Sequence, residues 1–472
     1  MSELLSLDLA ALAAGYRARR FSPVEVMAAV LAAAERANPV VNAFTLIDQE
    51  AALAAARASE ARWAAGKPAS GLDGAPFTVK DNILWTGRPA RRGSRTSPDA
   101  PAAENAPSVD RLIEAGAVPF AKTTLPEFGW KGLGDSPLTG FTRNPWDTRM
   151  TTGGSSAGAA AAAALGIGPL HIGTDGAGSI RIPCSFCGIF GIKPSFSRVP
   201  AYPPSPFGIV SHLGPMTHGV ADAAAMLGIV ARPDPRDIDA LWIPAPDYMA
   251  GLEDGIRGLR VAWSPRLGYV TDLHPEVEAL TTEAARVFSS LGADLAEDDP
   301  HISDPVEILR VLWRTGAALV LDGIAEEHWG ELDPGFLDEA QAGRTLSGAD
   351  FVRAANARAA NALAMAGFHE SYDLLLTPAV AVPAFEAGHN TPPDGSYGQD
   401  WLNWTPYSYP FNLTLQPAAT VPCGLTAGGL PVGLQIVGPM GRDDLVLKAA
   451  RAFEKARPWP RLGAPRVTHQ DG

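Results

Sequence analysis

The feature that most constrains the fold is a run of small residues between two clusters of glycine and serine. The run at 157–165 reads AGAAAAAAL, and it lies between GGSSAG at 153–158 and GTDGAGS at 173–179. Alanine is the strongest helix former, and a helix with small side chains all round approaches its neighbours closely. The run therefore predicts a helix buried between the layers of a large fold.

Short apolar runs alternate with helical stretches along the whole chain. AVPFAKT, PLHIGTD and GIFGIKP are typical of interior strands, whereas SPVEVMAAVLAAAERAN and DDLVLKAARAFEKA are typical of helices. This interspersion predicts one α/β domain over residues 1–472, with a mixed central β-sheet covered on both faces by helices. Within it we expect a core at about 74–195, a variable middle at about 230–400, and a C-terminal sheet and helix at 405–456.

Charge and composition limit the partners and the compartment. The chain has 38 Lys and Arg against 51 Asp and Glu, and its net charge of −13 repels phosphate backbones and anionic lipid surfaces. No stretch reaches the length of unbroken apolar sequence that a membrane span needs. We therefore expect a small-molecule substrate, with no nucleic acid and no membrane as partner. The sequence is compatible with a monomer or a homodimer.

The three cysteines are too few for a disulfide framework in a chain of 472 residues. Such usage is typical of a reducing compartment, so we expect a cytoplasmic protein. Cys184 and Cys187 form a C-x-x-C pair, but no second Cys or His pair lies nearby to complete a zinc site. Packing in the core is the better interpretation of this pair, and no metal or cofactor is expected.

Ser156 is one candidate nucleophile, because GSSAG at 154–158 fits the G-x-S-x-G pattern of a nucleophile elbow. An elbow needs a buried strand before the serine. The preceding TRNPWDTRMTTG is polar and is broken by Pro145, so it does not fit such a strand. None of the nine histidines lies in a setting that marks a general base, although the sequence does not exclude a distant one.

Ser179 is the second candidate, and it follows Gly176, Ala177 and Gly178. Small residues let consecutive backbone N–H groups converge on one spot, as an oxyanion requires, although they also fit a plain tight turn. A serine without a histidine needs another base, and lysine serves where burial lowers its pKa. Lys80 ends the apolar run PFTV, where a lysine is out of place; it also fits a strand-end lysine whose amine reaches water.

Taken together, PFTVKDN, GGSSAG and GTDGAGSIRIPCSFCGIFGIKPS resemble the amidase signature family. The C-terminal PFNLTLQPAATVPCGLTAGGLPVGLQIVG is similar to the family's terminal signature, and the resemblance runs from about residue 5 to 455. It implies a Ser–cis-Ser–Lys triad. Ser179 matches the nucleophile, Ser155 the bridging serine on a non-proline cis peptide, and Lys80 the base.

The resemblance also assigns backbone contacts and supporting residues. It implies that the oxyanion is held by consecutive N–H groups, those of Gly176, Ala177, Gly178 and Ser179. Gly129 in PEFGW matches a position that lines the substrate site. Three further matches, Thr174, Asp175 and Arg181, are expected to hold the loop. The family's NLTG reads NLTL here, so Leu415 replaces a small residue and is expected to alter packing near the site.

The resemblance implies a serine amidohydrolase that cleaves amide C–N bonds through an acyl-enzyme. We expect substrate choice to come from the variable middle and from the loop near 390–410, whose aromatic residues favour hydrophobic or aryl amides. These aromatics, which also fit core packing, are Trp313, Trp329, Trp401, Trp404, Tyr407 and Tyr409. The alternatives are a carbamate or ester hydrolase of the same fold, an amidotransferase A-type subunit, an inactive scaffold, and an esterase with a histidine base at Ser156.

Overall fold

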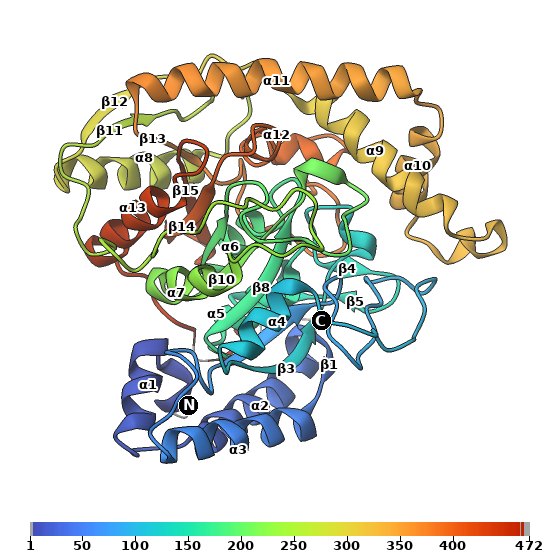
Figure 1. Cartoon of the computed structure of the whole chain (residues 1–472). Coiled ribbons are helices and arrows are strands. Elements are labelled where there is room, and N and C mark those ends of the chain that lie inside the picture. The colour runs from blue at the N-terminus through green and yellow to red at the C-terminus, as the bar shows by residue number, and fades with distance from the viewer. Residues whose placement is uncertain (1–2, 463, 467–472) are drawn as a thin grey trace.

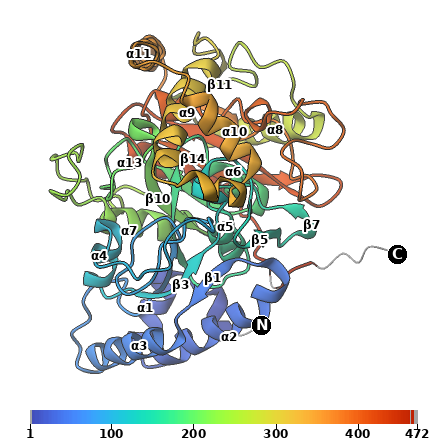
Figure 2. The same cartoon turned by 90° about the vertical axis from the view of Figure 1, so that its right-hand side faces the viewer.

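An 11-stranded mixed sheet runs through the computed structural model, which describes residues 3–462 and 464–466 (Figures 1 and 2). The strand order is β1-β3-β2-β8-β10-β9-β14-β15-β13-β11-β12. Strand β2 is parallel to β3 and β8, and β11 is parallel to β12 and β13, whereas the other neighbours are antiparallel. The bounds are β1 Phe44–Ile47, β2 Pro76–Lys80, β3 Val118–Thr123, β8 Leu170–Asp175, β9 Phe190–Lys193, β10 His212–Thr217, β11 Arg260–Trp263, β12 Asp294–Glu297, β13 Leu374–Pro378, β14 Ala418–Leu425 and β15 Pro431–Val437.

Helices cover both faces of the sheet, which confirms the predicted fold class. Helices α4, α7, α8 and α13 pack on one face, and α5 and α6 pack on the other. Helices α1 to α3 lie at the bottom of Figure 1, whereas α9 to α11 lie toward the top, at the opposite end of the molecule. The bounds are α1 Leu9–Arg17, α2 Pro23–Val41, α3 Gln49–Ala64, α4 Pro107–Glu114, α5 Ala157–Ala164, α6 Arg181–Cys187, α7 Val220–Val230, α8 Pro275–Ser290, α9 Val306–Asp322, α10 Pro334–Gly343, α11 Gly348–Ser371, α12 Pro410–Leu413 and α13 Asp443–Ala456.

Strand β2 is buried at every residue, and its two faces differ in chemistry. Phe77 and Val79 belong to the apolar core that also contains residues of α4 and α7. Because side chains alternate along a strand, Thr78 and Lys80 leave on the opposite face, where α5 packs. The lysine therefore points into the protein and away from the large apolar cluster.

The division of the chain into one domain stays a prediction, and the sheet supports it. Strands from the expected core, from the variable middle and from the C-terminal part all join the same 11-stranded sheet. Among the described residues, no helix has both the length and the apolar character needed to cross a membrane.

The alanine run forms α5, all eight of whose residues are buried, as predicted. Glycine is required at one position of this helix. A Cβ on Gly158 would lie 2.0 Å from the carbonyl oxygen of Ala43 and 2.6 Å from the backbone nitrogen of Thr124. Backbone atoms cannot move aside as a flexible side chain can. Helix α5 therefore packs so closely against the backbone of Ala43 and Thr124 that no methyl group fits between them.

We predict that Gly158→Ala destabilises the protein, although alanine favours helix over glycine by about 1 kcal/mol. Overpacking against fixed backbone costs about 1–3 kcal/mol, which exceeds the gain in helix propensity. A lower apparent melting temperature in thermal unfolding is the expected result.

Gly228→Ala is the matched control, because Gly228 lies in helix α7 and a Cβ there would meet no atom within 4 Å. Its apparent melting temperature should stay the same or rise. Equal melting temperatures for the two variants would contradict the close packing of α5.

Candidate active site

The candidate site lies at the edge of the sheet where the parallel strands β2 and β8 both end. Lys80 is the last residue of β2, and Asp175 is the last residue of β8. Ser155 and Ser156 come immediately before α5, whose first residue is Ala157. The carboxyl ends of parallel strands meet at one edge, so residues far apart in the sequence gather there.

Lys80 lies at the centre of this group. Its Nζ lies 2.8 Å from Ser155 Oγ, 3.0 Å from Ser156 Oγ and 2.8 Å from Thr174 Oγ1. The side chain is fully buried. Burial lowers the pKa of Lys80 well below its ordinary value, and the negative charge of Asp175 opposes this shift only in part. The neutral amine has two N–H donors and one lone pair for these contacts.

The hydrogen bonds distinguish the two neighbouring serines. Ser156 Oγ donates to the carbonyl oxygen of Thr174 at 3.1 Å and accepts from its N–H at 3.3 Å, so its proton is already used. Ser155 Oγ has a hydrogen bond to Lys80 Nζ and to no other group of the described chain. The proton of Ser155 is therefore the one that can point at the amine lone pair. The Gly154–Ser155 peptide is cis, as the family resemblance implied.

Ser179 lies next to this group and is held by it. The N–H of Ser156 donates to the carbonyl oxygen of Ser179 at 3.0 Å. Ser155 and Ser179 line the same pocket, as do Gly129 and Gly176. Gly129 fits directly against Ser155, because a Cβ at that position would lie 3.3 Å from Ser155 Oγ.

The backbone N–H groups before Ser179 do not all point the same way. The N–H of Gly178 donates to Asp175 Oδ1 at 2.7 Å and is therefore already occupied. The N–H groups of Gly176, Ala177 and Ser179 donate to no acceptor within the described part of the chain. Three of the four donors suggested by the sequence thus remain free, and the fourth fixes the loop.

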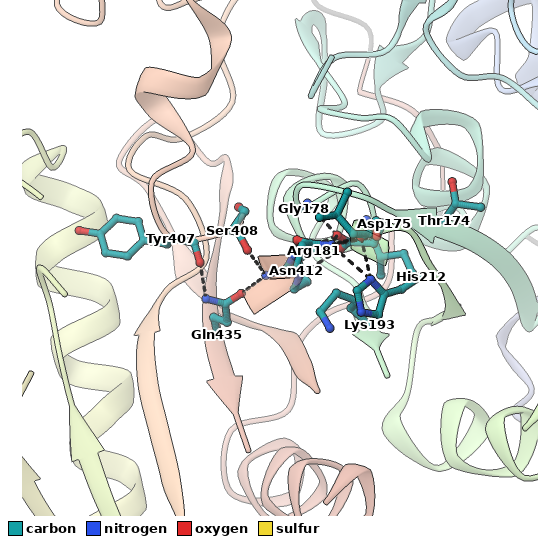
Figure 3. A network of polar contacts seen from close by, with 12 residues as sticks. Thr174, Asp175, Gly178, Arg181, Lys193, His212, Tyr407, Ser408, Asn412 and Gln435 are labelled. Carbon is teal, nitrogen blue, oxygen red and sulfur yellow. Dashed lines mark hydrogen bonds and ion pairs between the residues drawn. The ribbon is translucent and has the colours of Figure 1, made fainter. Parts of the chain in front are cut away.

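A buried network of polar contacts holds this loop (Figure 3). Arg181 forms a bidentate pair with Asp175 through Nε and one terminal nitrogen, at 3.0 and 2.9 Å. Both side chains are fully buried. Burial alone would raise the pKa of Asp175, but the charge and hydrogen bonds of Arg181 outweigh it and hold this pKa below its usual range. Asp175 thus stays ionised and keeps its hydrogen bonds to the loop.

The same arginine ties the loop to the C-terminal part of the chain. Its guanidinium donates to the Ser408 carbonyl at 2.7 Å, to Gln435 Oε1 at 2.7 Å and to Asn412 Oδ1 at 2.6 Å. Asn412 in turn donates to Asp175 Oδ1 at 2.9 Å. The two signature segments therefore meet at one ion pair, and Asp175 and Arg181 hold the loop as expected.

The pocket above the serines has aromatic and proline-rich walls, and its volume is about 890 Å³ including the open mouth. Trp313 of α9 reaches it, stacks on Phe207 with ring centroids 4.1 Å apart, and covers Gly176, where a Cβ would lie 2.9 Å from the indole. Phe128 lines another wall, and the segment 201–207 with its three prolines lines a third. These walls can accept an apolar or aryl group.

The expectation that the variable middle and the loop near 390–410 both line the substrate pocket was wrong in part. Of the six aromatics named from the sequence, Trp313 lines the pocket, whereas the loop near 390–410 contributes no lining residue. Trp404, for example, is buried between Phe186 and Phe385. The proline-rich AYPPSPF at 201–207 was the signal that could have marked the wall, because proline fixes the backbone of an exposed loop.

The elbow interpretation of Ser156 does not fit the structure. The preceding strand β7, Asp147–Thr151, pairs with β6, Arg143–Asn144, in a separate two-stranded ribbon. Ser156 itself does not line the pocket, and neither does any histidine of the described chain.

Two further sequence features also have structural counterparts. Cys184 and Cys187 are free thiols buried in α6. No three His, Cys, Asp or Glu side chains in the described ranges gather where they could hold a metal ion.

Leu415 has a φ of +67°, a backbone conformation that glycine adopts more readily than leucine. This conformation accounts for the small residue that the family has at this position.

Comparison with known proteins identifies the family. A family model described as Amidase matches residues 25–447. The chain belongs to the amidase signature family. It is 37% identical over 459 residues to an acylamidase of Rhodococcus erythropolis, covering 96% of each chain. It is 36% identical to the A-type subunit of the glutamyl-tRNA(Gln) amidotransferase of Myxococcus xanthus, covering 98% of this chain and 100% of the relative.

Solved structures agree with this family assignment. A bacterial aryl acylamidase of the amidase signature family matches with a TM-score of 0.89 and 29% identity, covering 96% of each chain. A 6-aminohexanoate cyclic dimer hydrolase complexed with substrate matches with a TM-score of 0.88 and 26% identity, covering 97% of this amidase and 98% of that chain. The protein is thus a hydrolase that acts on amide C–N bonds.

Proposed function

We propose that this amidase hydrolyses hydrophobic or aryl amides through an acyl-enzyme formed on Ser179. The observation that carries the proposal is the buried Lys80 amine, which lies 2.8 Å from Ser155 Oγ beneath the pocket that Ser179 lines. A lysine kept neutral by burial is a general base at ordinary pH.

In the first half of the reaction, Ser179 Oγ attacks the amide carbonyl and its proton passes to Ser155. Ser155 gives its own proton to the Lys80 lone pair, so no charge builds up on either serine. The carbonyl oxygen becomes an oxyanion, and the free N–H groups of Gly176, Ala177 and Ser179 are the donors we assign to it. Gly178 is assigned to loop support, because Asp175 occupies its N–H.

In the second half, the proton returns along the same path to the leaving nitrogen. The C–N bond breaks, the amine departs, and the acyl group remains as an ester on Ser179. Water then gives a proton to the relay, attacks the ester and releases the carboxylic acid. Lys80 and both serines end in their starting states, and no cofactor enters the scheme.

The choice of substrate class follows from the pocket walls. Trp313, Phe207 and Phe128 supply apolar area next to the reacting group, which suits an acyl chain or an aryl ring. The acylamidase relative and the aryl acylamidase structure agree with this choice. Carbamates and esters undergo the same acyl transfer and stay as alternatives within the fold.

A second candidate is an amidotransferase A-type subunit, which the 36% identical Myxococcus xanthus relative favours. Such a role would require partner chains, whereas we propose a stand-alone enzyme that is a monomer or a homodimer.

We also propose a cytoplasmic location. The three cysteines of this chain are free thiols, which supports a reducing compartment.

We predict that a fluorophosphonate probe labels Ser179, because an activated serine beside free N–H donors attacks phosphorus as it attacks a carbonyl. Peptide mapping by mass spectrometry identifies the modified residue, and Ser179→Ala should abolish labelling. An adduct on Ser156 would restore the elbow interpretation. No adduct on the purified chain would favour a partner-dependent role or an inactive scaffold, and glutaminase activity together with a co-purifying second chain would identify the former.

The two neighbouring serines give a matched pair for the proposed relay. Ser155→Ala removes the hydroxyl that we propose carries the proton from Ser179 to Lys80, and we expect kcat to fall by about 10²-fold or more. Ser156→Ala removes a hydroxyl whose proton is bonded to the Thr174 carbonyl, and its effect on kcat should be at least tenfold smaller. Equal losses in steady-state assays with an anilide would contradict the assignment of Ser155.

The pH dependence of kcat/KM tests the protonation state of Lys80. The base works as the neutral amine, so kcat/KM should fall about tenfold for each pH unit below the pKa of Lys80, as the amine gains a proton. Because burial lowers this pKa, the activity plateau should begin well below the pH at which an ordinary lysine loses its proton. An activity that rises only through the pH range of an exposed lysine would contradict the proposal.

A further inference from the structure

The charge of the pocket differs from the charge of the whole protein. The chain has a net charge of −13, yet no Asp or Glu side chain of the described residues lines the pocket above Ser155 and Ser179. Arg92 is the one cationic residue among the described residues that line it, and the others are apolar or carry hydroxyl or amide groups. Arg92 is therefore the one residue with a formal charge among the described residues that line the pocket.

Arg92 is solvent-exposed, its backbone is bonded to the pocket wall, and its side chain has no partner among the described residues. Its carbonyl accepts from the N–H of Phe128 at 2.7 Å, and Phe128 lines the same pocket. The guanidinium makes no ion pair, ring contact or side-chain hydrogen bond within the ranges that the structure describes. Its neighbour Arg91, by contrast, pairs with Asp99 at 3.3 Å and does not line the pocket.

The nearest buried charges do not neutralise Arg92. Lys122 forms its own pair with Asp81, with 3.4 Å between nitrogen and oxygen. Burial lowers the pKa of Lys122, and the positive charge of Arg92 also lowers it. Burial raises the pKa of Asp81 to about 6, and the charge of Lys122 opposes this rise, as do hydrogen bonds from the backbone of residues 91 and 92. The Asp81 carboxylate is paired with Lys122, which leaves the Arg92 guanidinium without an ion pair among the described residues. An unpaired guanidinium in this setting is available to an anion from outside the chain.

We propose that the pocket selects amides that carry a carboxylate and no ammonium group, with Arg92 as the residue that binds the carboxylate. This inference rests on the proposed function and narrows its substrate class. A free amino acid amide such as glutamine also carries an ammonium group, for which the pocket offers no acidic partner and which Arg92 repels. The pocket therefore suits the amide of a dicarboxylic acid, or the amide of an amine that bears a carboxylate.

Four amides of similar size test this proposal and locate the carboxylate. Butyranilide is neutral, succinanilic acid carries a carboxylate on its acyl part, 4-butyramidobenzoate carries one on its amine part, and 4-aminobutyranilide carries an ammonium group. The wild-type enzyme should show a higher kcat/KM for one of the two carboxylates than for butyranilide, and the lowest for the ammonium compound. The preferred carboxylate tells which side of the amide faces Arg92.

Variants at two adjacent arginines separate recognition of the carboxylate from a general loss of activity or folding. Arg92→Ala should lower the ratio of kcat/KM for the preferred carboxylate over butyranilide by at least tenfold, mainly through KM. Arg92→Lys should keep part of this ratio, because it keeps the charge but loses the bidentate fork. Arg91→Ala is the matched control and should keep the ratio, and thermal unfolding verifies that every variant folds.

The possible failures are distinguishable. A ratio that Arg92→Ala leaves unchanged, or a wild-type preference for the neutral or ammonium amide, overturns the inference and leaves the proposed function intact. Hydrolysis of none of the four amides while a fluorophosphonate still labels Ser179 overturns the carboxylate class alone. Absence of both hydrolysis and labelling overturns the proposed function together with this inference.

Discussion

The ion pair between Arg181 and Asp175 is the interaction on which the geometry of the site depends. Two fully buried charges are tolerable because every polar atom of the guanidinium fork finds an acceptor and the carboxylate accepts backbone N–H groups of the loop. Removal of one partner from such a pair costs about 3–5 kcal/mol, since the other is left charged and buried. The pair fixes the turn before Ser179 and joins it to the C-terminal strands through Gln435.

Burial disfavours charge at both Asp175 and Lys80, but the outcome is the opposite at Lys80, whose amine contacts Thr174, the residue before Asp175. This lysine has no carboxylate as a hydrogen-bond partner, only hydroxyl and carbonyl oxygens of Ser155, Ser156 and Thr174. The protein therefore disfavours its charged form, whereas it favours the charged form of Asp175. One buried environment thus yields a permanent anion that holds structure and a neutral amine that can accept a proton.

The small residues around the site allow neighbouring segments of the backbone to pack closely against one another. Helix α5 brings its N-terminal end with Ser155 against β2 and β8 because its faces carry alanine and glycine only. Gly129 lies against Ser155 and Gly176 lies against Trp313, and a Cβ at these places would lie 3.3 Å from Ser155 Oγ and 2.9 Å from the indole. The walls of the pocket come from elsewhere in the chain, so in the proposed function the reaction and the choice of substrate depend on separate segments.

The sequence by itself determined the fold class, the family and the residues that gather at the site, because these depend on local patterns: buried strand runs, an alanine helix and glycine–serine turns. Lys80, Ser155 and Ser179 were named from motifs alone, and the structure places all three at one edge of the sheet. Their catalytic roles remain proposals. Only the tertiary structure decided which N–H groups are free, which serine proton is available, and which side chains line the pocket. Those properties depend on atoms that lie far apart in the chain, such as Arg92 and Trp313, and no local pattern encodes the distance between them.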